Sequence, residues 1–156
     1  MTDVQFRDAT QADVAAVIAM LREDDLGASR EVASLDVYEA AFATLEAQPQ
    51  THLIVGEHGG AVVAFYQLTT IDGLSHCAAR RGNIEDVRVA LRLRGQGIGH
   101  AMMEDAAARA RALGCDLLQL VAHQTRQAAH AFYVSAGFTA SHVGFKRNLS
   151  AVENAQ

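Results

Sequence analysis

Apolar positions recur along the chain with two different periods, and these periods predict where the helices and strands lie. A capping-box pattern at Thr10 and Asp13 opens the first helix. Four apolar residues then follow at helical spacing: Val14, Val17, Ile18 and Leu21. After a polar loop over residues 23–31, further helices are predicted over residues 36–48, 99–113 and 126–136. Pro49 ends the first of these three, and Gly114 closes the second.

Strand-like runs of apolar and β-branched residues fill the space between these helices. They cover residues 4–7, 52–56, 61–70, 84–91, 116–122 and 137–149. Gly59 and Gly60 separate the second and third runs, which predicts a tight antiparallel hairpin. Hairpins come first, and strand–helix alternation follows. This order predicts an α+β domain, or equally a mixed-sheet α/β domain, with helices flanking the sheet.

Composition restricts the organisation and the partners of the protein. The 156 residues show no repeat or low-complexity tract, so we predict one domain over residues 1–150 and a tail over 151–156. The formal net charge of −5 argues against sequence-independent nucleic-acid binding. No apolar run approaches the roughly 18 residues that cross a bilayer, and the polar N-terminus does not resemble a signal peptide. We therefore expect no membrane partner.

Cysteine and histidine usage indicates neither disulfides nor a metal site. Cys77 and Cys115 lie far apart and form no CxxC pair, so we expect free thiols and a reducing, cytoplasmic location. Nothing around them resembles a Cys-His catalytic pair. The seven histidines show no HExxH pattern and no Cys/His ligand spacing, so no metal is predicted.

The strongest chemical signal is a glycine-rich turn between a predicted strand and a predicted helix. Its sequence is Arg94-Gly95-Gln96-Gly97-Ile98-Gly99-His100. Glycines let a ligand approach the backbone, and the start of the following helix attracts anions. Arg94 can add a bidentate phosphate contact. No Gly-Lys pair completes a P-loop, and His100 replaces the third glycine of a dinucleotide fingerprint. A purely structural connection remains the alternative.

A second motif lies about 40 residues downstream. Residues 128–138 form an Ala-containing stretch with the pair Phe132-Tyr133, followed by Gly137-Phe138. The two motifs, in this order, resemble motifs A and B of the GNAT N-acetyltransferases. That resemblance implies a central, mostly antiparallel sheet that is splayed where acetyl-coenzyme A (acetyl-CoA) binds. It also implies transfer of the acetyl group directly to an amine, without an acyl-enzyme.

The resemblance assigns roles to individual residues. The turn from Arg94 to His100 would wrap the cofactor pyrophosphate, and the backbone of Val87 and Val89 would contact the pantetheine arm. Val89 N–H is our choice for the donor to the thioester oxygen. Tyr133 would protonate the leaving thiolate, unless it is only an aromatic residue that packs beside Phe132.

Two assignments are less direct. Glu85 is the leading general base, with His76 as runner-up, and a structural carboxylate remains the alternative for Glu85. Strict strand alternation predicts that Glu85 shares a face with Val87 and Val89. Arg126 replaces an asparagine that many relatives carry seven residues before the motif B tyrosine. It would contact the 3′-phosphate of the cofactor or be a solvated arginine at a helix start.

The acceptor is only broadly defined as an amine of a small molecule or of a protein. By the resemblance, residues 23–31 and 72–83 shape its pocket. The carboxylates of the first loop would receive a cation or be solvated, and Arg80 and Arg81 in the second loop would bind an acceptor carboxylate or cofactor phosphates. The resemblance also allows a homodimer through the apolar last strand. A non-catalytic acyl-CoA-binding sensor or scaffold module is the alternative to an enzyme.

Overall fold

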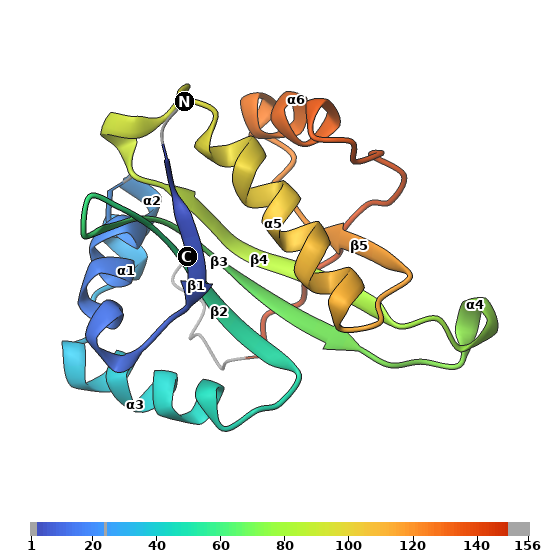
Figure 1. Cartoon of the computed structure of the whole chain (residues 1–156), viewed down its shortest axis with the longest axis horizontal. Helices are drawn as coiled ribbons and strands as arrows, with labels where there is room; N and C mark the ends of the chain where they lie inside the picture. The colour runs from blue at the N-terminus through green and yellow to red at the C-terminus, as the bar shows by residue number, and fades with distance from the viewer. Residues whose placement is uncertain (1–2, 24, 150–156) are drawn as a thin grey trace, which may run out of the picture. The chain divides into compact units, whose positions relative to one another are not determined.

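A mixed five-stranded sheet forms the centre of the first of two compact units, Met1–Leu120 and Val121–Gln156 (Figure 1). The structure is a computed structural model that describes residues 3–23 and 25–149. In sheet order, the strands are β1 (Gln5–Asp8), β2 (Thr51–His58), β3 (Ala61–Ile71), β4 (Arg81–Val89) and β5 (Leu117–Leu120). The neighbours β1 to β4 pair antiparallel, and β5 pairs parallel with β4. The predicted α+β class is confirmed.

Helices connect the strands of the first unit and flank the sheet. They are α1 (Val14–Leu21), α2 (Asp25–Arg30), α3 (Leu35–Glu46), α4 (Ser75–Ala78) and α5 (Ile98–Ala112), with 3-10 turns η1 (Gln11–Asp13) and η2 (Leu91–Leu93). The second unit contains α6 (Gln127–Ser135). Helix α2 lies where a loop was predicted, because six residues are too few to show a helical period. None of the helices described is long and apolar enough to cross a bilayer.

The hairpin between β2 and β3 forms at the predicted glycine pair. His58 pairs with Ala61, so Gly59 and Gly60 are the two turn residues. Both adopt positive φ, 57° and 78°, which a two-residue turn of type I′ requires. This turn places β3 in the middle of the sheet, between β2 and β4.

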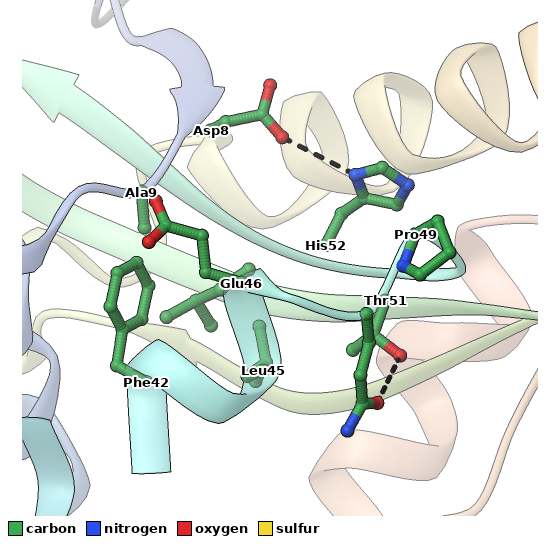
Figure 2. Close-up of a pocket in the computed structure, with 10 residues that line it drawn as sticks. Asp8, Ala9, Phe42, Leu45, Glu46, Pro49, Thr51 and His52 are labelled. Carbon is green, nitrogen blue, oxygen red and sulfur yellow. Dashed lines mark hydrogen bonds and ion pairs between the residues drawn. The ribbon is translucent and has the colours of Figure 1, made fainter. Parts of the chain in front are cut away.

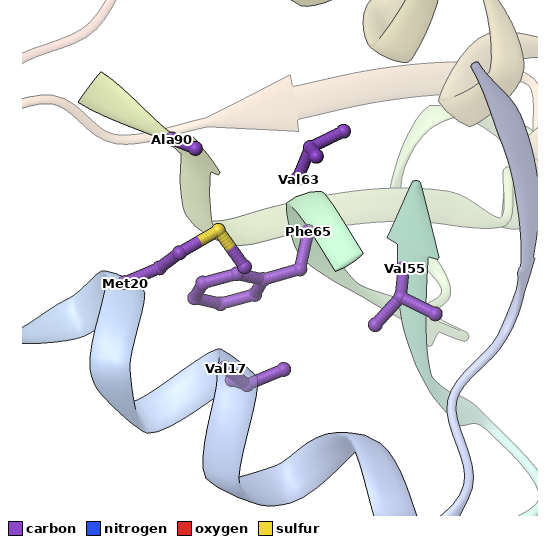
Figure 3. Packing of buried hydrophobic residues seen from close by; sticks show 6 residues of the cluster. All are labelled: Val17, Met20, Val55, Val63, Phe65 and Ala90. Atoms are coloured by element: carbon purple, nitrogen blue, oxygen red, sulfur yellow. The ribbon is translucent and has the colours of Figure 1, made fainter. Parts of the chain in front are cut away.

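Helix α1 covers one face of the sheet. Figure 3 shows side chains of α1 packed against two strands, β2 and β3, and the residue after β4: Val17, Met20, Val55, Val63, Phe65 and Ala90. All six are at least 95% buried. Phe42 of α3 joins α1 in a smaller adjoining cluster. This face is called the α1 face below.

Helix α5 covers the opposite face, called the α5 face below. Its buried residues are Ile98, Met102, Met103, Ala106 and Ala110. The hydroxyl of Tyr66, a fully buried residue of β3, donates to Asp105 Oδ2 at 2.6 Å, and Arg109 Nε donates to the same oxygen at 2.9 Å. Since Tyr66 belongs to the central strand, this network fixes α5 on the sheet.

The structure corrects the prediction for the end of the chain. Strand β5 is shorter than predicted, and the predicted strand over residues 137–149 is absent from the part of the second unit that the structure describes. Apolar alternation is not sufficient, because a strand also needs a neighbour to accept its backbone hydrogen bonds. The bonds found here are local, such as Ser141 N–H to Thr139 O. The predicted tail, 151–156, lies outside the described residues.

Candidate active site

The glycine turn of motif A forms the start of α5. Gly95 and Gly97 have φ of 77° and 84°, and Gly97 is the N-cap residue of the helix. The first hydrogen bond inside the helix runs from Ala101 N–H to Gly97 O. The amides of Ile98 and Gly99 precede that bond and therefore have no acceptor within the helix. A Cβ atom at Gly95 or Gly97 would meet nothing within 4 Å, so the turn is open to a ligand.

Side chains tie this turn to the neighbouring elements. Arg94 Nε donates to Val89 O at 3.1 Å, and Gln96 Nε2 donates to Arg92 O at 3.4 Å. Leu91 N–H, at the start of η2, donates to the carboxylate of Glu23 at 2.9 Å. The predicted phosphate-binding arginine is therefore held against the last residue of β4, where it is exposed.

The sheet opens beside this turn. Strand β5 pairs only with residues 81–84 of β4, so within residues 3–120 the second half of β4 lacks a strand neighbour on that side. Ala90 N–H donates to Val63 O at 2.8 Å, which directs the carbonyl of the preceding residue, Val89, away from β3. By alternation, the Val89 amide also faces the open edge. The predicted splay is confirmed.

A β-bulge interrupts β4 immediately before this opening. Asp86 has φ of 53°, and the two residues Asp86 and Val87 together lie opposite the single residue Tyr66. An aspartate in the left-handed region is uncommon, and such conformations concentrate at functional sites. The bulge also ends the strict alternation on which our sequence prediction relied.

The bulge corrects the predicted placement of Glu85. Glu85 pairs with Gln67, and Arg88 pairs with Phe65, so both project to the α1 face. Val89 pairs with Ala64 and projects to the α5 face. Glu85 therefore does not share a face with Val89. Its side chain is exposed. The physical reason for the changed face is the residue that the bulge inserts, Asp86 with its positive φ. Hydrophobic periodicity contains no signal for such an insertion.

The other candidate base lies at the opposite end of β4. His76 is exposed in α4, a left-handed turn that precedes the strand. Arg80, nearby, donates to Asp72 at 2.7 Å and to Leu113 O at 2.9 Å, beyond the C-terminal end of α5. The glycine turn lies at the other end of that 15-residue helix, a distance of about 22 Å. The structure therefore does not bring His76 or Arg80 to the turn.

The second unit contains the remaining two predicted site residues. Arg126 is exposed at the N-cap of α6, and its N–H donates to His123 O. Tyr133 is half-buried, with ring centroids 5.2 Å from Phe132 and 5.9 Å from Phe138. Gly137, with φ of 89°, turns the chain so that Phe138 N–H reaches Tyr133 O. Their roles in catalysis and binding stay predictions.

Two carboxylates of the acidic segment between α1 and α3, those of Glu23 and Glu31, accept hydrogen bonds from other groups of the protein. Glu23 accepts from Leu91 N–H, as described above. Glu31 accepts from Arg30 Nε at 2.7 Å and from the Tyr38 hydroxyl at 3.1 Å, and the Arg30 hydrogen bond lowers the pKa of Glu31. Asp24 lies outside the described residues. The carboxylates of Glu23 and Glu31 therefore have structural partners and are not a ready cation site.

A surface pocket lies between α3, the end of β1 and the start of β2, and none of the predicted site residues lines it (Figure 2). His52 lies there with Nδ1 3.6 Å from Asp8 Oδ1. Phe42, Leu45 and Pro49 provide apolar walls. Within residues 3–23 and 25–149, no three His, Cys, Asp or Glu side chains are arranged to hold a metal ion. The glycine turn and the open edge of β4 therefore remain the candidate site.

Comparison with known proteins decides the family. The family model for acetyltransferases of the GNAT family matches residues 16–138, which include the glycine turn and motif B. The chain belongs to the GNAT acetyltransferase family. It is 29% identical over 145 residues to an aminoalkylphosphonate N-acetyltransferase of Salmonella typhimurium, covering 93% of this chain and 91% of that protein. Acetyl transfer is therefore the general activity of this GNAT protein.

Solved structures share the same fold. A protein described as a transcriptional regulator from Bacillus halodurans superposes with a TM-score of 0.89 at 36% identity, covering 94% of this chain and 99% of that one. An acetyltransferase of Trypanosoma brucei gives a TM-score of 0.77 at 25% identity, with 94% and 100% covered. The GNAT-like architecture predicted from the two motifs is confirmed.

Proposed function

We propose that this acetyltransferase moves the acetyl group of acetyl-CoA directly to a primary amine of a small molecule or protein within a ternary complex. The observation that carries the proposal is the open edge of β4, which leads within a few residues into the glycine turn at the start of α5. An extended ligand with a phosphate end fits this sequence of features. The strand edge offers backbone hydrogen bonds, and the helix start offers an anion site.

The residues present fit acetyl-CoA, which supplies a thioester-activated acetyl group. The turn from Arg94 to His100 would hold the pyrophosphate, because its glycines leave the space around the backbone open. Val87 and Val89 would hold the pantetheine arm through their backbone at the open edge. Arg126, at the start of α6, would contact the 3′-phosphate.

Three groups would then serve the transfer. Val89 N–H would donate to the thioester oxygen as charge develops on it. Glu85, directly or through water, would take the proton that the attacking nitrogen loses as the new N–C bond forms. Tyr133 would give a proton to the departing sulfur as the C–S bond breaks. A phenol with a pKa near ~10 is suited to protonating a thiolate.

Calorimetric titration with acetyl-CoA, using NAD and ATP as controls, tests the cofactor. We expect selective binding in the micromolar range, because the turn lacks the patterns that recognise the other two ligands. If a folded sample fails to bind acetyl-CoA, the proposed function is wrong. Thiol release with a panel of amines then tests transfer.

Tyr133→Phe separates an enzyme from a non-catalytic acyl-CoA-binding module. The second candidate is kept because the 36% identical relative from Bacillus halodurans is described as a transcriptional regulator. We expect at least a tenfold loss of kcat with unchanged acetyl-CoA affinity, because only proton donation is removed. Tyr38→Phe removes a hydroxyl that bonds Glu31 instead and is the matched control. Unchanged turnover in Tyr133→Phe would refute the acid assignment.

A further inference from the structure

Arg88 is a charged residue at the open edge of β4 that the sequence analysis did not assign to any role. The backbone N–H of Arg88 points toward Phe65 of β3. The carbonyl of the preceding residue, Val87, therefore faces away from β3. Arg88 Nη1 donates to that carbonyl at 3.0 Å. The guanidinium therefore lies against the open edge, one residue before the Val89 amide.

The guanidinium of Arg88 is incompletely satisfied by the protein. Its Nε is buried and has no hydrogen-bond partner among the described residues. Other arginines of the chain pair with aspartates: Arg7 with Asp13, Arg80 with Asp72, and Arg109 with Asp105. Within the described part of the chain, no such carboxylate pairs with Arg88. A buried N–H of a charged group without a partner is costly, so an anion that reached Nε would stabilise this guanidinium.

The position of Arg88 distinguishes that anion from the cofactor phosphates. Arg88 projects to the α1 face, whereas α5 and the start of that helix lie on the α5 face. The Arg88 side chain thus leaves β4 on the face opposite to α5, and its guanidinium lies at the open edge of the strand. A ligand bound there would approach the Val89 amide from the side opposite to the cofactor turn, as the acceptor must in a direct transfer.

Glu85 provides an opposite charge on the same face. Glu85 and Arg88 pair with Gln67 and Phe65, which are two residues apart on β3, so their Cα atoms are about 7 Å apart. Among the ion pairs of the described residues, none joins these two side chains. The same face of β4 therefore carries an exposed carboxylate and a half-buried arginine that form no ion pair with each other.

We propose that the acceptor is a small zwitterion, in which an amine lies toward Glu85 and an acid group two or three carbons away is bound by the Arg88 guanidinium. This proposal rests on the acetyl transfer proposed above and specifies its substrate class. A carboxylate and a phosphonate share the required chemistry, because both accept two N–H bonds from an arginine fork. Arg88 is thus a specificity-determining residue.

The experiment compares acceptors that carry the same primary amine. Thiol release from acetyl-CoA is measured with 2-aminoethylphosphonate, β-alanine and propylamine, and the first two identify which acid is preferred. We expect the wild type to use an acid-bearing amine at least tenfold better than propylamine. Arg88→Gln should lower kcat/KM for that amine by about 10- to 100-fold, the range for a charged hydrogen bond, through KM. Turnover of propylamine should stay within twofold.

Control variants separate recognition from folding and from net charge. Arg111→Gln removes the same charge from the exposed last turn of α5 and should leave all three substrates unchanged. Arg88→Lys keeps the charge but not the fork and should retain part of the preference. If Arg88→Gln does not fold, as judged by circular dichroism, Arg88→Lys and the wild-type preference decide.

Several results would overturn the proposal. These are equal losses with all substrates in Arg88→Gln, a wild-type preference for propylamine, or acetyl-CoA binding without turnover of either acid-bearing amine. Transfer to propylamine without a preference would overturn the zwitterion while leaving acetyl transfer intact. Absence of acetyl-CoA binding would instead refute the proposed function itself, so the two failures are distinguishable.

Discussion

At the scale of single residues, Asp13 connects the first helix to the edge of the sheet. Arg7 of β1 donates to both of its carboxylate oxygens, at 2.7 and 2.9 Å, and Thr10 N–H donates to it at 2.8 Å. The Arg7 hydrogen bonds and the Thr10 N–H lower the pKa of Asp13 from 3.8 to about 2, against the effect of burial. The ionised form is therefore stabilised in the folded protein.

The lowered pKa of Asp13 predicts a dependence of stability on pH. Because the folded pKa lies below the unfolded value, the contribution is complete above pH 4 and is lost as the pH falls toward 2. Since Arg7 is partly solvated, we expect about 1–2 kcal/mol. Urea unfolding should show Asp13→Asn destabilised by this amount at pH 7 but close to the wild type at pH 2. An equal gap at both values would contradict the assignment.

At the scale of elements, α5 begins at the glycine turn where we propose that the cofactor binds. Its N-cap residue Gly97 and the glycine that follows its C-terminal end, Gly114, have φ of 84° and 77°. A Cβ would meet nothing within 4 Å at either position. The two glycines therefore carry the same conformational requirement at opposite ends of one helix.

This symmetry gives a matched pair of variants. Gly97→Ala and Gly114→Ala should each lower the free energy of unfolding by about 1–2 kcal/mol, because alanine is strained at positive φ. Only Gly97→Ala should also lower the affinity for acetyl-CoA, because the new methyl group and the altered turn would lie where the cofactor phosphates are proposed to bind. Calorimetry measures the affinity and urea unfolding the stability. Similar acetyl-CoA affinities in the two variants would contradict the proposed binding of the cofactor at this turn.

Elements differ in how far the sequence predicts them. The glycine-pair hairpin, the capping box at Thr10 and the 15-residue helix α5 all have local chemical signals, and all three form. The bulge at Asp86 and the single carboxylate bond of Glu23 to Leu91 N–H have none. They arise from contacts between distant segments, so the shared face of Glu85 and Arg88 becomes visible only in the register of β3 and β4.

At the scale of the whole molecule, the central sheet and the end of the chain differ in their backbone hydrogen bonding. Strands β2, β3 and β4 pair along most of their length and are covered on both faces. In the second unit, the apolar side chains of Val143, Phe145 and Leu149 are 78%, 93% and 87% exposed. The apolar pattern here resembles a strand, but the sequence cannot specify whether a neighbouring strand is available.

Hydrogen exchange measured by mass spectrometry tests this difference. The amides of β2–β4 that pair with a neighbouring strand should exchange only through global unfolding, because their ladders are buried, whereas peptides from residues 139–149 should exchange close to the intrinsic rate. Slow exchange of this segment at every protein concentration would contradict the prediction and indicate pairing within the chain. Protection that increases with protein concentration would instead indicate pairing with a second copy. Such pairing would give the exposed Phe145 a buried environment and support the homodimer allowed by the sequence.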